Sequence, residues 1–197
     1  MLSAITSELE LEAPSTVTGV SVRKAAMRDI PAILGLINGY AAAGVMLPRT
    51  EFELSENMRD FAVAHAGGRL VGCGALHFYS PVIGEVRSLA VSPHVKIRGI
   101  GRNIIRFLLN EAQEYYLGAV FAFTYVPGFF SRVGFSEVER GALPLKAWKD
   151  CLRCPKFQNC DEIAVLRVLD AELWDPAALS SPDPDLLIQL PTKKKID

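Results

Sequence analysis

Hydrophobic residues follow two different spacings along this chain, and the spacing changes from one segment to the next. After Asp29, which can cap a helix, apolar residues recur every three or four positions until Gly44, as on one face of a helix. Apolar runs on both sides of Gly67-Gly68 instead predict a β-hairpin. This alternation of helices and strands predicts an α/β fold. The predicted elements are strand 20–25, a helix from 30 that stops at Gly44, helix 51–58, strands 60–66, 69–79 and 84–91, helix 101–117, strand 119–124, helix 128–133 and strand 163–169.

The two ends of the chain differ from the segment between them. Residues 1–18 contain few large, periodic hydrophobic residues, and residues 171–197 combine prolines with a lysine cluster near the C-terminus. We therefore expect an N-terminal tail over 1–18, a single folded domain over 19–170 and a C-terminal tail over 171–197.

Composition narrows the classes of function and partner. The 21 Lys and Arg residues nearly balance the 22 Asp and Glu residues, so the chain lacks the excess of basic residues that would indicate a nucleic-acid partner. No apolar run is long enough to span a bilayer, and Glu8, Glu10 and Glu12 stand where a secretory signal would need basic and apolar residues. We expect a cytoplasmic protein with reduced cysteines, no nucleic-acid or membrane partner, and possible assembly into a homodimer.

A basic loop with two glycines follows the strand that ends near Val91. Gly99 and Gly101 allow close approach to backbone N–H groups at a helix start, which is a common binding site for phosphate. The loop lacks the Gly-Lys-Ser/Thr of ATP-binding P-loops and the three-glycine dinucleotide fingerprint. It therefore predicts a site for a pyrophosphate. The surrounding basic residues are Lys96, Arg98, Arg102 and Arg106.

Residues 96–101 resemble the Arg/Gln-x-x-Gly-x-Gly loop of the GNAT superfamily of acyl-CoA N-acyltransferases, with Lys96 at the first position. Lysine keeps the charge of the usual arginine but not its planar guanidinium. The resemblance implies a single-domain GNAT fold, with a mixed central sheet flanked by helices, and acetyl-CoA as the acetyl donor. It also implies contacts to the donor from the strand, the loop and a later aromatic helix. The residues at these positions are Leu89, Ala90, Val91, Lys96, Ile97, Arg98, Gly99, Ile100, Gly101, Arg102, Phe129 and Phe130.

A second segment, residues 127–135, resembles the Phe-Tyr-x-x-x-Gly-Phe helix that lies against the pantetheine arm in the same superfamily. Phe130 stands where many relatives have the tyrosine that protonates the leaving thiolate. Tyr125 is near enough in sequence to replace that acid. Alternatively, the thiolate leaves without help, because a thiol with a pKa of about 8.5 is a fair leaving group.

The strand before the basic loop carries the candidate base. Its alternation predicts one shared face for four residues, namely Glu85, Arg87, Leu89 and Val91. Glu85 matches the position of the glutamate base in some GNAT relatives, and a carboxylate can take a proton from a substrate ammonium through water. An ion pair of Glu85 with Arg87 is the alternative, and His77 is another candidate base.

The chain shows a longer match in five segments, residues 44–49, 72–77, 85–91, 124–130 and 143–148. Together these segments resemble the short, stand-alone N-acetylglutamate synthases of bacteria. The resemblance implies transfer of acetyl to the α-amine of L-glutamate, the first step of arginine biosynthesis. Arginine binds a carboxylate through two parallel hydrogen bonds. The resemblance assigns substrate binding to Arg49, and the predicted strand geometry adds Arg87.

Three cysteines, Cys151, Cys154 and Cys160, lie close together in the sequence. A structural zinc site needs four ligands and the cluster has no obvious fourth, so we expect no bound metal. A metal completed from elsewhere and a redox-sensitive cluster stay as alternatives. Three functions therefore remain open: glutamate acetylation, acetylation of another small amine or a protein N-terminus, and CoA binding by a regulator without catalysis.

Overall fold

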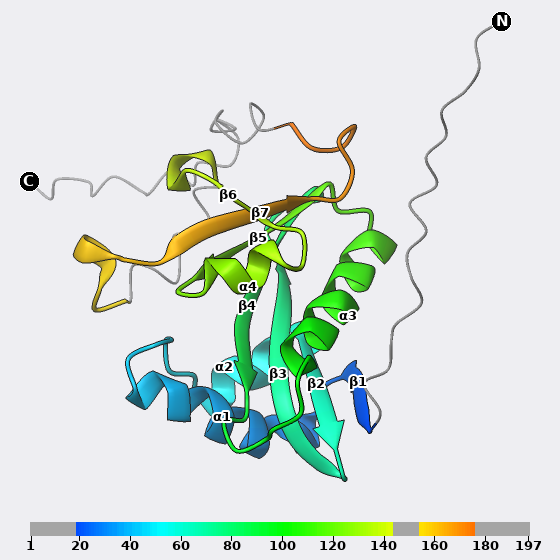
Figure 1. Cartoon of the computed structure of the whole chain (residues 1–197), viewed down its shortest axis with the longest axis vertical. Coiled ribbons are helices and arrows are strands. Elements are labelled where there is room, and N and C mark those ends of the chain that lie inside the picture. The colour runs from blue at the N-terminus through cyan, green and yellow to red at the C-terminus, as the bar shows by residue number, and fades with distance from the viewer. Residues whose placement is uncertain (1–18, 144–153, 176–197) are drawn as a thin grey trace, which may run out of the picture. The chain divides into compact units, whose positions relative to one another are not determined.

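The computed structural model describes residues 19–143 and 154–175, which form two compact units (Figure 1). The first unit contains the described residues up to Leu76 together with Val86–Glu111. The second contains His77–Glu85 and the described residues from Ala112 onward. The tail at 1–18 and most of the tail at 171–197 lie outside the described residues, so the boundaries at 18/19 and 170/171 stay predictions.

The first unit is a sheet with a helix layer on each face. Its strands lie in the order β1-β2-β3-β4, and both β1–β2 and β2–β3 are antiparallel pairs. The β2–β3 hairpin turns at Gly67 and Gly68, both at positive φ, which confirms the predicted turn. Strands β3 and β4 and helix α3 continue into the second unit. The bounds are β1 Val20–Lys24, α1 Ile30–Ala42, α2 Glu51–Glu56, β2 Phe61–Ala66, β3 Arg69–Phe78, β4 Ile83–Val91 and α3 Ile100–Glu114.

Helices α1 and α2 start in different ways. At α2, Thr50 Oγ1 accepts a hydrogen bond from the Glu53 amide at 3.2 Å, and the Glu53 carboxylate accepts one from the Thr50 amide at 2.8 Å. Asp29 precedes α1 but makes no such bond to it. The Asp29 carboxylate instead accepts hydrogen bonds from the Ala26 amide and from two nitrogens of Arg23. The predicted side-chain cap at Asp29 is therefore wrong, because an ion pair with the first strand engages the carboxylate.

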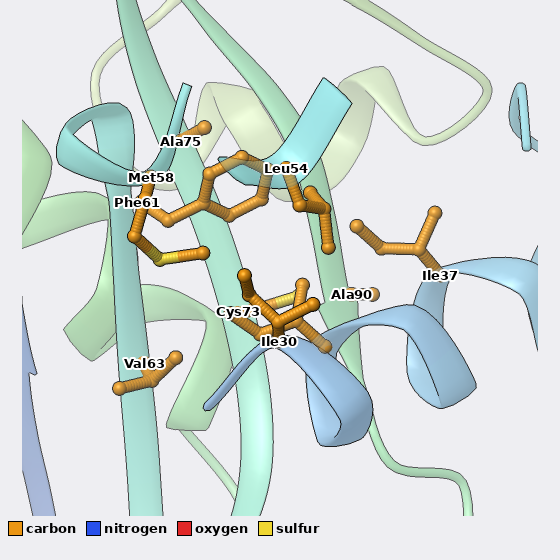
Figure 2. Packing of buried hydrophobic residues seen from close by; sticks show 10 residues of the cluster. Ile30, Ile37, Leu54, Met58, Phe61, Val63, Cys73, Ala75 and Ala90 are labelled. Atoms are coloured by element: carbon orange, nitrogen blue, oxygen red, sulfur yellow. The ribbon is translucent and has the colours of Figure 1, made fainter. Parts of the chain in front are cut away.

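Helices α1 and α2 cover one face of the first sheet through an apolar cluster (Figure 2). Ile30, Ile33 and Ile37 recur at three- and four-residue intervals on α1, and all three are buried. Cys73 and Ala75 of β3 belong to the same cluster. Side chains alternate between the faces of a strand, and α3 contacts the intervening residues of β3, so α3 covers the opposite face.

The second unit continues from β4 in the order β4-β5-β7-β6. β5 is parallel to β4, whereas β7 is antiparallel to both β5 and β6. Parallel and antiparallel pairs together confirm the predicted mixed sheet. The sequence pattern does not predict the two-residue β6. The bounds are β5 Ala119–Thr124, α4 Pro127–Ser131, β6 Ser136–Glu137 and β7 Ile163–Val168, with 3-10 turns at Arg140–Ala142 and Phe157–Asn159.

A separate aromatic cluster fills the interior of the second unit around β5. The Phe121 ring is fully buried and lies 5.6 Å from the ring of Tyr79 and 6.0 Å from that of Phe123. Among the described residues of both units, no helix has the length and apolarity needed to cross a membrane.

Candidate active site

The predicted pyrophosphate loop leads directly into α3. Gly99 adopts a φ of 88°, and its carbonyl accepts a hydrogen bond from the Asn103 amide at 2.9 Å. The amides of residues 100–102 lie in the first helical turn, where the helix itself offers no acceptor. Lys96, just before this turn in the sequence, and Arg102, within it, are both exposed. The amides at the start of the helix and the basic side chains around them therefore both favour binding of an anion at this position.

Two glycines of β3 allow α3 to lie close to the sheet. A Cβ atom added at Gly72 would lie 2.9 Å from Ile104 Cδ1, and one added at Gly74 would lie 2.9 Å from Ile104 Cγ2. Both distances are shorter than an ordinary carbon–carbon contact, so a side chain there would force a shift of Ile104 or of the helix that carries it and the loop. Sequence reasoning missed this role, although glycines inside a strand often indicate close approach of another element.

Ser88 interrupts the alternation of side chains along β4. Its φ is 53°, a left-handed backbone conformation in the middle of the strand. Arg87 pairs with Asp60 beside α2, whereas Leu89 lies near Gly74 on the α3 side. The prediction that Arg87 and Leu89 share one face is therefore wrong, because Ser88 acts as an extra residue in the way that a β-bulge does.

The end of β4 is tied to α1 by a residue that sequence reasoning did not single out. Tyr40 donates its hydroxyl to the Val91 carbonyl at 2.6 Å. The two residues are 51 positions apart, so only the fold brings them together. This bond holds the β4 end from which the basic loop departs.

Arg49 lies in the connection between α1 and α2, and the Asn38 side chain holds its backbone on both sides. The Arg49 amide donates to Asn38 Oδ1 at 2.9 Å, and Asn38 Nδ2 donates to the Arg49 carbonyl at 3.0 Å. The capping box at Thr50 follows immediately. The loop is thus fixed at the one residue that the resemblance assigns to substrate binding.

Arg87, the second predicted substrate arginine, is largely buried. Its side chain is 14% exposed, and Nη2 lies 3.6 Å from Asp60 Oδ2 and 3.4 Å from Asn57 Oδ1. These contacts orient the guanidinium. The Asp60 ion pair is a structural role that the sequence pattern does not predict.

Glu85, the predicted base, lies on β4 within the second unit. The residue is 8% exposed, and its Oε2 accepts a hydrogen bond from the Tyr79 hydroxyl at 2.9 Å. The His77 ring contacts the Tyr79 ring edge-on with centroids 5.1 Å apart. The two candidate bases, Glu85 and His77, are therefore joined through Tyr79. A buried carboxylate oriented by a hydrogen-bond donor has the geometry of a proton acceptor.

The aromatic helix α4 places Phe130 in the interior. Its ring meets those of Phe129 and Phe135 edge-on, at 5.3 Å and 5.2 Å between centroids, and the residue is 4% exposed. Phe129 is half-buried. Phe130 is thus part of the core packing and has no hydroxyl, so the tyrosine acid that the resemblance implies at this position is missing and any acid must come from another residue.

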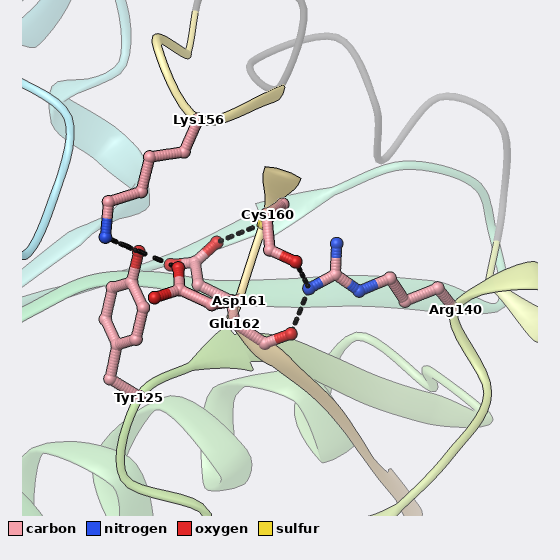
Figure 3. A network of polar contacts seen from close by, with 6 residues as sticks. All are labelled: Tyr125, Arg140, Lys156, Cys160, Asp161 and Glu162. Carbon is pink, nitrogen blue, oxygen red and sulfur yellow. Dashed lines mark hydrogen bonds and ion pairs between the residues drawn. The ribbon is translucent and has the colours of Figure 1, made fainter. Parts of the chain in front are cut away.

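Tyr125, the predicted replacement acid, lies just after β5 and belongs to a polar network (Figure 3). Lys156 Nζ lies 3.1 Å from the Tyr125 hydroxyl, 4.8 Å from the ring centroid and 3.3 Å from Asp161 Oδ1. Burial raises the pKa of the Tyr125 hydroxyl, while the hydrogen bond from Lys156 opposes that rise. Sequence reasoning missed Lys156, which is 31 residues away from its tyrosine.

The same network extends to Arg140 and the start of β7 (Figure 3). Arg140 donates to the carbonyls of Cys160 and Glu162, and its guanidinium lies 5.9 Å from the centre of the Phe123 ring. The Cys160 thiol donates to Glu162 Oε2 at 3.8 Å. Burial raises the pKa of the Glu162 carboxyl, and Arg140 partly offsets this. Arg140 therefore fixes the backbone that carries Asp161.

The cysteines of the described residues are free thiols. Cys154 and Cys160 are half-buried, and burial raises the pKa of the Cys73 thiol to about 12, so that thiol is unreactive. Cys151 lies outside the described residues. Within residues 19–143 and 154–175, no three His, Cys, Asp or Glu side chains gather as metal ligands would.

The predicted site residues divide between the two units. The first unit holds the basic loop, residues 89–91 and both arginines predicted to bind substrate, whereas the second holds Glu85, Tyr125 and the aromatic pair of α4. The first group suits an anionic ligand with carboxylate and phosphate groups. The second group suits proton transfer.

Known proteins resemble the chain over most of the described residues. A family model described as an acetyltransferase (GNAT) domain matches residues 57–137. An uncharacterized N-acetyltransferase of Chlorobaculum tepidum is 40% identical over 148 residues, which cover 75% of this chain and 96% of the relative. An amino-acid acetyltransferase of Mycobacterium tuberculosis is 40% identical over 163 residues, covering 81% and 90% respectively. N-acetylglutamate synthase from Neisseria gonorrhoeae, complexed with coenzyme A and N-acetyl-glutamate, has a TM-score of 0.69 and 28% identity over 76% of this chain and 35% of that one.

Proposed function

The chain belongs to the GNAT acetyltransferase family, and on that premise we propose that it acetylates the α-amine of L-glutamate. It is an acetyl-CoA-dependent N-acetyltransferase that acts on a small amino acid. The gonococcal neighbour, which holds N-acetyl-glutamate, supports glutamate among the amino acids. We assign the reaction to the first step of arginine biosynthesis in the cytoplasm.

The observation that carries the choice of acceptor is the fixed position of Arg49. Both polar atoms of the Asn38 side chain hold its backbone, so little loop entropy is lost when the guanidinium binds a carboxylate. Arg87 supplies a second oriented guanidinium. Two arginines match the two carboxylates of glutamate, and a monocarboxylic amino acid would use one of them.

The donor is assigned to the loop and the strand before it. The pyrophosphate of acetyl-CoA takes the α3 start at residues 99–102 with Lys96 and Arg98, while Leu89, Ala90 and Val91 lie along the pantetheine. The assignment draws on the amides of the first helical turn and the exposed basic side chains around them.

The reaction needs three proton transfers around one acyl transfer. Glu85 takes a proton from the substrate ammonium through water, and the free amine then attacks the thioester carbonyl. The carbon–sulfur bond breaks with its electron pair on sulfur, the nitrogen of the new amide gives its second proton to water, and Tyr125 gives its hydroxyl proton to the thiolate. The buried Glu85 with its Tyr79 donor and the Tyr125 hydroxyl beside Lys156 support these two roles.

The test is acetyl-CoA turnover by the purified chain over a panel of amino acids, amines and N-terminal peptides. We expect glutamate to have the highest kcat/KM. Arg49→Ala should raise the KM for glutamate about ten- to hundredfold, since a hydrogen bond to a charged group contributes about 1.5–3 kcal/mol. Asn38→Ala should raise that KM less, because it loosens the loop but leaves the guanidinium.

Arg69→Ala is the matched control, because Arg69 is an exposed arginine at the start of β3 outside the assigned site. Arg69→Ala should leave the KM for glutamate and the KM for acetyl-CoA unchanged. A parent enzyme that acetylates a different amine, with no turnover of glutamate above background, would overturn the proposed acceptor. Tight acetyl-CoA binding with no turnover of any amine would instead indicate a regulator.

A further inference from the structure

We propose that Lys156 and Asp161 form a positioning pair that controls proton donation by Tyr125: Lys156 stabilises the phenolate left behind, and Asp161 holds the ammonium in place. The proposal rests on the acid role assigned to Tyr125 in the proposed function. It adds two residues outside every motif that the resemblance covers, and it explains how the chain manages with Phe130 in place of the usual tyrosine.

The geometry places one ammonium between a phenol and a carboxylate. Lys156 Nζ lies 3.1 Å from the Tyr125 hydroxyl and 3.3 Å from Asp161 Oδ1 (Figure 3). The same nitrogen lies 4.8 Å from the Tyr125 ring centroid, so charge and ring attract each other as well. Lys156 thus reaches both the hydroxyl and the ring of one tyrosine.

The proton balance explains why such a pair is needed. A phenol has an ordinary pKa of about 10 and a thiol one of about 8.5, so proton transfer from an unassisted tyrosine to a thiolate is unfavourable by a factor of about 30. The oxygen–hydrogen bond of Tyr125 breaks, the sulfur–hydrogen bond forms, and a negative charge remains on the phenolate. The adjacent ammonium stabilises that charge at the moment it develops. Water then returns a proton to the phenolate after CoA leaves.

The charges around Tyr125 act on it in opposite directions. Burial raises the pKa of its hydroxyl first of all, Lys156 lowers it, and the carboxylates of Asp161 and Glu162 raise it. Arg140 and Cys160 face Glu162 rather than the phenol. The contacts with Tyr125 and Asp161 raise the pKa of the Lys156 amine, which favours the ammonium form. Removal of Lys156 and removal of Asp161 should therefore shift the tyrosine pKa in opposite directions.

The experiment compares Lys156→Met, Asp161→Asn and the conservative Lys156→Arg by two readouts. The first is phenolate absorbance during alkaline titration, with the Tyr125→Phe curve subtracted to remove the other tyrosines. The second is kcat against pH with the best amino-acid acceptor of the panel. An acid must be protonated to act, so kcat falls as pH rises through its pKa.

For Lys156→Met we expect the Tyr125 pKa and the alkaline fall of kcat to move to higher pH. Its kcat near neutral pH should drop about tenfold with an unchanged KM for acetyl-CoA. Asp161→Asn should move both to lower pH, and Lys156→Arg should keep both near the parent values. Arg69→Met, an exposed basic residue in the first unit, should change neither readout.

The proposal is overturned if the Tyr125 titration is the same in Lys156→Met and the parent, or if both single variants shift it in one direction. A kcat loss without a shifted titration also overturns it, because Lys156 would then act on something other than the tyrosine. The titration needs no turnover. Failure of the parent to acetylate glutamate therefore sinks the proposed acceptor while leaving this test intact.

Discussion

The basic loop of the first unit and the Tyr125 network of the second unit position their charged side chains in different ways. At the loop, basic side chains are exposed, and the backbone is positioned by apolar contact between Ile104 and the glycines of β3. At Tyr125, the Lys156 ammonium directly contacts both the tyrosine hydroxyl and the Asp161 carboxylate. In the first unit, packing thus determines where the loop backbone lies, whereas in the second unit the side chains of the network position one another.

The two arrangements should respond differently to substitution. A change of packing beneath α3 moves the loop and should alter the affinity for the donor. A change of charge around Glu85 or Tyr125 leaves the backbone in place and should alter kcat. A split between KM effects and kcat effects is therefore the direct test of the comparison.

The largest effect is expected from Glu85→Gln in the second unit. The amide keeps the shape of the side chain and can still accept from Tyr79, but it cannot take up a proton at neutral pH. Loss of a general base costs about 10²- to 10⁴-fold in rate, so kcat should fall at least about 100-fold with little change in the KM for acetyl-CoA. Steady-state kinetics at saturating glutamate measures this.

Glu137→Gln, an exposed glutamate of β6, is the matched control and should keep the parent rate. If Glu85→Gln keeps most of the parent kcat, the proton acceptor lies elsewhere, and His77→Ala becomes the next variant to measure. If Glu85→Gln instead raises the KM for acetyl-CoA, the contrast between the two units fails.

Gly74→Ala tests the first unit. The added Cβ would lie 2.9 Å from Ile104 Cγ2 and 3.3 Å from Leu89 Cδ1 in a buried region, so these side chains, or the helix and strand that carry them, must shift. Overpacking of this kind costs about 1–3 kcal/mol. We expect a lower Tm and weaker CoA binding by calorimetry, with a kcat at saturating acetyl-CoA close to that of the parent.

Gly39→Ala provides the control within the same unit. Gly39 lies in α1, and an added Cβ there meets nothing within 4 Å. Removal of a helical glycine should raise the stability by about 0.5–1 kcal/mol and leave CoA binding unchanged. Equal CoA affinity in both glycine variants would show that the close packing of α3 on β3 does not position the loop.

The same contrast separates what the sequence predicts from what it does not. The Thr50–Glu53 capping box and the Gly67-Gly68 turn were predictable because each depends on residues a few positions apart. The glycines and basic residues of the loop are visible in the local sequence for the same reason, and the pyrophosphate site that they indicate stays a prediction. The Lys156–Tyr125 and Tyr40–Val91 contacts join residues 31 and 51 positions apart, and no local spacing reveals them. Ser88 is the intermediate case, since its positive φ breaks an alternation that the strand sequence itself displays.

The smallest effect concerns the pH dependence of stability, which should have opposite signs in the two units. The Arg23 guanidinium lowers the pKa of Asp29 from 3.8 to about 2, so this carboxylate stabilises the folded state above pH 3.8, and the contribution is lost as pH falls toward 2. Because the Arg23 side chain is 38% exposed, Asp29→Asn should cost only about 1 kcal/mol at neutral pH.

Burial raises the pKa of Glu162 above 4.5, so that carboxylate opposes folding at neutral pH and the penalty disappears on acidification. Urea unfolding at pH 7 and at pH 3 measures both. The stability deficit of Asp29→Asn should shrink on acidification, and so should any gain of Glu162→Gln over the parent. If the two variants instead differ from the parent with the same sign at pH 7, burial does not dominate at Glu162.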